Sequence, residues 1–176
     1  MIRRIGFMKV VCVVGLTGII ALVGAMQVSA DGEQSVPFAA ALSGTAEWDG
    51  GPVMTCQGEG IASHLGRTVS QCTSVLDLAN YQLYAECAGE GTGFGIPNIN
   101  TVTLTAADGD RLVLVSVDLA CEIVQGTSFH GTGLWTVDAF ESTGRFAGAT
   151  GTGNLDGKVD FSTGDVMVNV TGEIAF

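Results

Sequence analysis

The chain is poor in basic residues. Its 176 residues include 7 Lys and Arg against 18 Asp and Glu, which gives a formal net charge of −11. Three of the basic residues lie within the first ten positions, and four lie beyond them: Arg67, Arg111, Arg145 and Lys158. An anionic surface repels phosphate backbones and anionic lipid headgroups, so the composition argues against nucleic acid as a partner.

The sequence also lacks the common motifs of catalysis and cofactor binding. It contains no Gly-x-Ser-x-Gly elbow, no His-Glu-x-x-His pair and no phosphate-binding Gly-x-x-x-x-Gly-Lys-Ser/Thr loop. No segment has the spacing of an amphipathic helix. We therefore expect no metal and no cofactor, and the sequence identifies no catalytic residue.

The N-terminus has the pattern of a cleaved secretory signal peptide. Arg3, Arg4 and Lys9 precede an apolar stretch over residues 10–26, and small residues follow at Ser29 and Ala30. We predict cleavage after Ala30 and a single domain over residues 31–176, with no membrane span in the mature chain. Removal of the signal leaves four basic against eighteen acidic residues, a formal charge of −14. The mature protein is predicted to be secreted, extracellular or periplasmic.

The mature chain has four cysteines, and an even number in an oxidising compartment predicts two disulfides. Cys56 and Cys72 are symmetric about His64, so a hairpin that turns there places them opposite each other on one face. This favours Cys56–Cys72 and leaves Cys87–Cys121. A four-thiolate zinc site would need Cys-x-x-Cys pairs, which the sequence does not contain.

Alternation of apolar and polar residues predicts an all-β domain. It is clearest over residues 166–176, where Val166, Val168 and Val170 alternate with polar neighbours. Eight strands separated by glycine-rich turns favour a single eight-stranded antiparallel up-and-down β-barrel, calycin-like in architecture. The expected strands cover residues 36–48, 53–63, 67–76, 98–106, 111–119, 129–140, 152–161 and 166–176.

Two segments do not fit the alternation. Residues 81–97 are expected to form a strap or lid pinned by Cys87, with a short strand over 83–87 and a glycine-rich loop over 89–95. Residues 142–153 carry four glycines, which favour a corner that turns the sheet into its last hairpin. We expect Arg145 and Phe146 to hold this corner.

Three short motifs resemble those of a known family. They are residues 62–67 (Ala-Ser-His-Leu-Gly-Arg), 106–110 (Ala-Ala-Asp-Gly-Asp) and 143–151 (Thr-Gly-Arg-Phe-Ala-Gly-Ala-Thr-Gly). Together they resemble secreted bacterial proteins of the allene oxide cyclase barrel-like group, and the plant dirigent proteins have a similar late Gly-Arg-Phe segment. The resemblance implies a barrel fold, and it implies a cyclase or isomerase as one function. No catalytic residue of the plant enzymes maps onto this chain by a motif.

Polar and aromatic side chains at predicted turns and strands supply candidate ligand-binding residues. His64 and Arg67 at a barrel mouth could bind a carboxylate or phosphate, although hairpin capping explains them more simply. Arg145 could belong to an anion-binding loop, or it could reach carbonyls and carboxylates of the fold. Trp135 could line a pocket or fill the core. His130 is a candidate general base if it faces a cavity, with Glu122 or Asp138 to orient it, but exposure is expected.

Small residues share one face on several strands, as at Gly58 and Gly60, Gly131 and Gly133, and Gly151 and Gly153. If they point inward they leave room for a ligand, whereas at bends they allow the sheet to coil. Our leading hypothesis is a non-enzymatic secreted barrel that binds a small apolar molecule or serves as a surface or envelope component. The alternative is a cyclase or isomerase that acts on a lipid-like or phenolic substrate. The sequence leaves the oligomeric state open.

Overall fold

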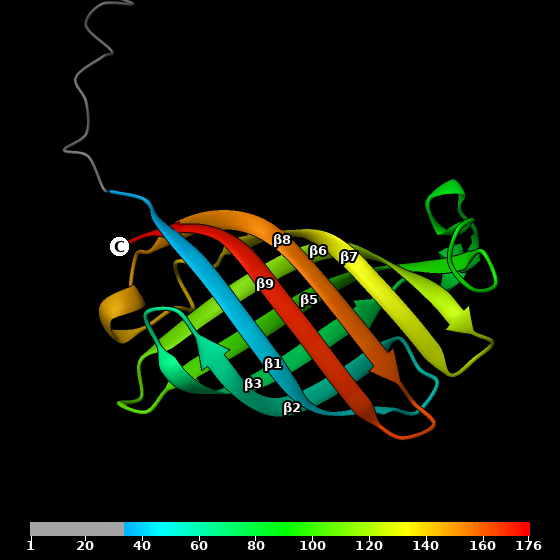
Figure 1. The fold of residues 1–176 in the computed structure, drawn as a ribbon, viewed down its shortest axis with the longest axis horizontal. Helices are drawn as coiled ribbons and strands as arrows, with labels where there is room; N and C mark the ends of the chain where they lie inside the picture. The colour runs from blue at the N-terminus through cyan, green and yellow to red at the C-terminus, as the bar shows by residue number, and fades with distance from the viewer. Residues whose placement is uncertain (1–33) are drawn as a thin grey trace, which may run out of the picture. The chain divides into compact units, whose positions relative to one another are not determined.

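The computed structural model describes residues 34–176, which form an antiparallel β-barrel (Figure 1). The eight-stranded barrel predicted from the alternation is confirmed, and one short extra strand, β4, is added to it. The predicted signal peptide lies outside the described residues. The strands are β1 (Val36–Trp48), β2 (Val53–Ala62), β3 (Gly66–Leu76), β4 (Gln82–Leu83), β5 (Phe94–Ala106), β6 (Arg111–Val124), β7 (Ser128–Val137), β8 (Thr150–Asp160) and β9 (Asp165–Ala175).

Closure of the barrel depends on two pairings between strands that are not consecutive. β1 pairs with β9, and β3 pairs with β5, so that the ring runs β1-β2-β3-β5-β6-β7-β8-β9 and returns to β1. Every pairing in the ring is antiparallel. A closed ring has no exposed edge strand, which removes a route to aggregation.

Inward-facing side chains fill one end of the barrel, which we call the packed end. Trp135 is fully buried there, and its indole N–H lies 3.1 Å from the carbonyl oxygens of Asn154 and Thr171. Its ring meets Phe38 edge to face, with centroids 5.7 Å apart. A Cβ added at Gly153 or Gly172 would come within 2.8 or 2.7 Å of Trp135 Cζ2. These glycines therefore make room for the indole.

The corner between β7 and β8 lies at the packed end; residues 142–149 form it as predicted, while residues 150–153 already belong to β8. It contains a short 3-10 helix, η3 (Gly144–Phe146), which Figure 1 shows at the opposite end of the barrel from β4. Phe146 is fully buried, while Arg145 reaches Asp108 at 3.3 Å and Asp110 at 3.6 Å. Arg145 and Phe146 thus hold the corner against the β5–β6 hairpin.

The strap over residues 77–93 differs in detail from the prediction. Its strand is β4 (Gln82–Leu83), and Cys87 lies instead in a 3-10 helix, η2 (Ala85–Cys87). A further 3-10 helix, η1 (Leu78–Asn80), precedes β4. β5 begins at Phe94, earlier than predicted, because Gly95 pairs with both Gln82 and Cys121. Pairing with two neighbours extends β5 toward its N-terminus, where alternation alone would begin the strand later.

Both predicted disulfides are confirmed. Cys56 and Cys72 are register partners on β2 and β3, with Cα atoms 4.9 Å apart. Cys87 and Cys121 join the strap to β6, with Cα atoms 5.3 Å apart. The Cys87–Cys121 disulfide restricts the conformations of the strap in both the unfolded and the folded chain.

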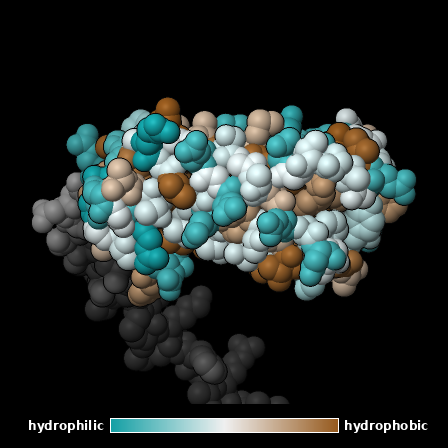
Figure 2. Space-filling view, turned by 90° about the horizontal axis from the view of Figure 1, so that it is seen from below, coloured by the Kyte–Doolittle hydropathy of each residue, from teal (hydrophilic) through white to brown (hydrophobic). Residues whose placement is uncertain are grey.

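The outer surface carries both polar side chains and exposed apolar ones, among them Ile61, Val117 and Leu134. Figure 2 shows one face of the molecule, on which hydrophobic residues form separate patches among hydrophilic ones. Within residues 34–176, no helix has both the length and the apolar character that crossing a membrane requires.

Candidate functional site

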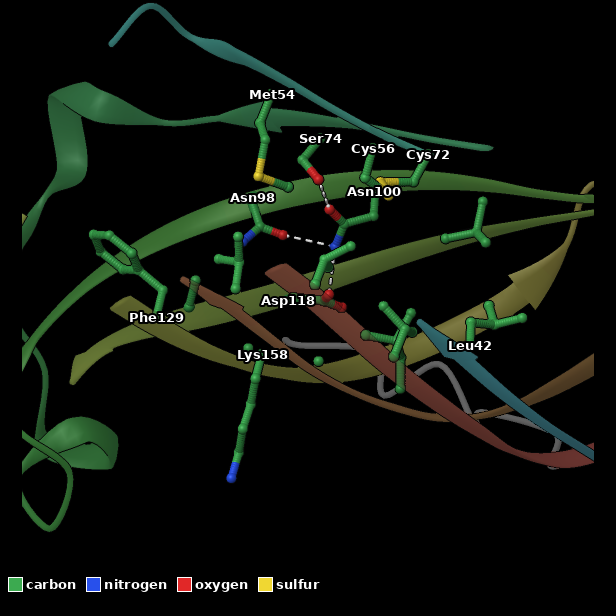
Figure 3. A pocket seen from close by; sticks show the side chains of 18 of the residues that line it. Leu42, Met54, Cys56, Cys72, Ser74, Asn98, Asn100, Asp118, Phe129 and Lys158 are labelled. Carbon is green, nitrogen blue, oxygen red and sulfur yellow. Dashed lines mark hydrogen bonds between the residues drawn. A yellow bond between two sulfur atoms is a disulfide. The ribbon is translucent and has the colours of Figure 1, made fainter. Parts of the chain in front are cut away.

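A cavity of about 100 Å³ lies inside the barrel, toward the end opposite the packed end (Figure 3). We call this the cavity end. It is where β1, β3, β6 and β8 finish and β2, β5, β7 and β9 begin. An aromatic rim surrounds it: the rings of Trp48 and Phe161 are 5.0 Å apart, and those of Phe129 and Phe161 are 6.1 Å apart. For scale, an apolar cavity of about 150 Å³ in another protein holds a benzene molecule.

The cavity exists because small residues occupy inward-facing positions on three neighbouring strands, β6, β7 and β8. Gly131 pairs with Ala120 on one side and with Gly157 on the other. A Cβ added at Gly131 or Gly157 would find its nearest neighbours 3.8 and 3.7 Å away, which is ordinary van der Waals contact. At the packed end, by contrast, the Trp135 ring fills the space beside Gly153 and Gly172. Inward glycines thus leave open space in one half of the barrel, which was one of the two interpretations made from the sequence. In the other half they make room for a core side chain, which was not predicted from the sequence.

Most of the lining is apolar. Leu42, Ile96, Val102, Leu155 and Val168 contribute aliphatic surface, and the Cys56–Cys72 disulfide lies on the wall. Ligand sites typically combine such a surface with a small number of placed polar groups. The cavity has such a group, which we call the Asp118 cluster: Ser74, Asn98, Asn100, Ser116 and Asp118.

Asn100 is the centre of the cluster (Figure 3). Its side-chain amide N–H groups donate to Asp118 Oδ2, to Asn98 Oδ1 at 2.9 Å and to Ser116 Oγ at 3.3 Å. Its carbonyl oxygen accepts from the hydroxyl of Ser74. The cluster joins β3, β5 and β6 across the inside of the barrel, so the strands fix its position.

Asp118 is 6 % exposed, and its Oδ1 has no hydrogen-bond partner. Burial raises the pKa of this carboxyl to about 6, against the opposing effect of hydrogen bonds from Ser116 and Asn100. Oδ1 packs over Gly133, where an added Cβ would overlap it. A buried carboxylate with an unused oxygen is uncommon in native proteins and marks a candidate site.

Lys158 also borders the cavity, but its side chain points away from it (Figure 3). Its strand neighbours Gly157 and Val159 line the cavity, and side chains alternate along a strand. Asp118 is therefore the ionisable side chain that faces the cavity among the lining residues of the described chain. Within residues 34–176, no group of three His, Cys, Asp or Glu side chains is placed to hold a metal ion.

His64 and Arg67 lie at the packed end, away from the cavity. His64 occupies the β2–β3 turn with φ of 65°, its Nε2 is 3.0 Å from the carbonyl oxygen of Pro37, and its ring packs on Phe176. Arg67 is exposed and lies 3.8 Å from Glu59. These contacts are those of a hairpin end, the simpler interpretation made from the sequence.

The other two predicted ligand-binding residues also serve the packed end. Trp135 is part of the core, and Arg145 pairs with carboxylates of the β5–β6 hairpin. The structure does not bring the four residues together, and none of them lines the cavity. Their proposed contact with a ligand remains a prediction.

His130 lies on the outside of the barrel, between two carboxylates. Its Nδ1 is 2.7 Å from Glu90 and its Nε2 is 3.0 Å from Asp156. Burial would lower the pKa of His130, but the hydrogen bonds and charges of Asp156 and Glu90 raise it overall. The orienting carboxylates are thus not Glu122 or Asp138, and His130 acts as a link between the strap and β8.

Glu122 is buried at the end of β6, where it anchors the strap. Its carboxylate accepts from the Thr92 hydroxyl and from the Gly126 backbone N–H, each at 2.7 Å. Burial alone would raise its pKa, but these bonds and one from Tyr81 lower the pKa of Glu122 below the ordinary value. Both carboxylate oxygens of Glu122 are therefore occupied by hydrogen bonds that stabilise the fold.

Sequence reasoning missed Asp118 and its neighbours, although a signal was present. Side chains two residues apart on a strand point to the same face, so Asp118 lies on the same face as the buried Leu112 and Leu114. Asn100 lies on the same face as Val102 and Leu104. A polar side chain on the apolar face of a predicted strand is expected to be inside. Following the alternation of faces along β5 and β6 would have identified Asn100 and Asp118 as inward-facing polar residues.

The fold and the site together define a disulfide-bonded antiparallel β-barrel with an internal, mainly apolar cavity. Comparison with family models, with curated proteins and with solved structures gives no match.

Proposed function

We propose that this protein is a secreted barrel that binds a small, mainly apolar molecule in the cavity. The observation that supports this most directly is the cavity of about 100 Å³, lined by aliphatic side chains and bordered by the Asp118 cluster. Two disulfides suit an oxidising compartment outside the cytoplasm. The resemblance to allene oxide cyclase barrel-like and dirigent proteins stays a prediction.

Packing energetics favour occupation of the cavity. Protein interiors are normally filled at the density of organic crystals, and an unfilled cavity forfeits dispersion contacts on its walls. A Cβ at Gly131 would meet only ordinary van der Waals contacts and no backbone clash. The space beside Gly131 and Gly157 is open, and an apolar ligand bound there would regain those dispersion contacts.

Binding of hexan-1-ol tests the proposal with a matched pair of variants. Gly131→Leu fills the cavity, whereas Thr132→Leu places the same side chain on the outer face of the same strand. We expect hexan-1-ol to shift the NMR signals of cavity-lining residues in the wild type and in Thr132→Leu, and not in Gly131→Leu. Absence of any shift in the wild type, or equal binding by both variants, would contradict the proposal.

Native mass spectrometry of the protein from its own host provides a second measurement. We expect an adduct whose mass is lost in the Gly131→Leu variant. The bare mass with two disulfides, in wild type and variant alike, would count against a tightly bound carrier ligand.

A cyclase or isomerase acting on a lipid-like or phenolic substrate is the second candidate function. One observation favours it: Asp118 is an ionisable group inside an apolar cavity, and burial brings its pKa to about 6, close to working pH. General acid or base catalysis is most efficient with such a group. An Asp118→Asn variant that binds a substrate unchanged but no longer converts it would support this function over simple binding.

A further inference from the structure

The Asp118 cluster indicates which chemical class of small molecule the cavity takes. This inference rests on the proposed function, because it concerns what the cavity binds. We infer that the occupant is a small apolar molecule that carries a protonated amine, and that its ammonium group pairs with Asp118.

The first argument is that Asp118 is an acid without a cation. Of the four Lys and Arg residues in the described part of the chain, Arg67 and Arg145 lie at the packed end in contact with other carboxylates. Arg111 is at the beginning of β6, beside Thr143 of the corner. Lys158 points outward. A buried carboxylate is normally paired, and here the fold does not supply the partner.

The second argument is the unused capacity of the carboxylate. An ionised carboxylate accepts about four hydrogen bonds. The carboxylate of Asp118 accepts from Asn100, at Oδ2, and from Ser116, while Oδ1 is buried with no partner. A carboxylate turns over a broad range about its Cβ–Cγ bond, so the free oxygen can turn toward a donor in the cavity. The missing element is a donor, and a cationic donor forms the stronger bond.

The third argument is the set of acceptors around Asp118. An ammonium group has three N–H donors and accepts nothing. The cluster offers the side-chain oxygens of Ser74, Asn98 and Asn100 in addition to the carboxylate, and all three residues line the cavity. A ligand carboxylate would instead meet the like charge of Asp118, which is unfavourable at short range in a poorly solvated site.

The fourth argument is the charge of the whole molecule. With four basic against eighteen acidic residues after the signal segment, the mature chain attracts cations and repels anions. The long-range field and the local site therefore favour the same class of ligand. The aliphatic walls around Leu42, Val102 and Leu155 would hold its hydrocarbon part.

A series of three ligands of one chain length separates charge from shape. Hexan-1-amine, hexan-1-ol and hexanoate are titrated calorimetrically at pH 7.5 into the purified protein with both disulfides intact. We expect the amine to bind at least about tenfold more tightly than the alcohol, and hexanoate to bind more weakly than either. Equal affinities for amine and alcohol would overturn the inference and leave the proposed function standing, whereas binding of none of the three would overturn both.

Two isosteric variants assign the preference to the cluster. Asp118→Asn removes the charge from inside the barrel, and Asp156→Asn makes the same change on the outer face of β8. We expect Asp118→Asn to lose about tenfold or more in amine affinity and to keep its alcohol affinity, which also reports an intact cavity. Asp156→Asn should retain the amine preference. If Asp118→Asn binds hexan-1-amine as the wild type does, the inference is wrong.

Discussion

Asp118 should cost the protein stability at neutral pH, and removing its charge should recover that stability. The carboxyl is 6 % exposed, and its pKa is raised from 3.8 to about 6 by burial. Asp118→Asn keeps the shape of the side chain, and its carbonyl oxygen can still accept the hydrogen bond from Asn100. The substitution therefore changes the charge of the cluster with little change in packing.

The pKa difference sets the size and the sign of the effect. Each pKa unit corresponds to about 1.4 kcal/mol, so a shift from 3.8 to about 6 amounts to about 3 kcal/mol. Between these two pH values the folded protein holds a proton that the unfolded chain has lost, so wild-type stability falls as pH rises. Above pH 6 the loss is complete, and below pH 3.8 it is absent. Asn100 and Ser116, which contact the carboxylate, do not titrate in this window.

Urea unfolding of wild type and Asp118→Asn from pH 4 to pH 8 measures this difference directly. The other carboxylates contribute equally to both proteins and cancel. We expect Asp118→Asn to be similar to wild type at pH 4 and more stable by up to about 3 kcal/mol at pH 7, with a melting temperature higher by roughly 10 °C. Glu141→Gln, at an exposed turn, should show no such trend. A stability difference that does not change with pH would refute the reasoning.

Two further predictions concern glycines and the strap. Gly131→Ala should leave the free energy of unfolding nearly unchanged. Gly153→Ala should lose roughly 2–4 kcal/mol, because its Cβ meets the Thr171 carbonyl and the Trp135 ring. Equal losses of stability in urea unfolding would contradict the assignment of Gly131 to the cavity and Gly153 to the packed end. The pKa of His130, measured by NMR titration, should lie above its ordinary value and fall in Glu90→Gln. Because the folded pKa is the higher one, the stability from His130 is present below pH 6.5 and lost as pH rises through the folded pKa; a His130 that titrates identically in both proteins would disprove the link.

Local periodicity was enough to predict the strands and one of the disulfides. Val166, Val168 and Val170 alternate with polar neighbours because one face of a strand is buried and the other is not. The symmetric spacing of Cys56 and Cys72 about a turn predicted their pairing, since directly opposed residues share a face. The strap was less predictable, because its short strand depends on pairing with the beginning of β5.

The site depended on which inward side chains the neighbouring strands place beside each position. Gly131 and Gly153 are indistinguishable in sequence, yet one faces Ala120 and open space while the other faces an indole ring. In the same way, alternation places Asp118 inside, but its unpaired oxygen follows from the absence of a cation on the strands that face it. The sequence by itself determined the barrel strands, the acidity and the disulfide framework, because these depend on the order and spacing of residues along the chain. Tertiary structure alone decided the cavity and the state of Asp118, because both arise between strands that closure brings together.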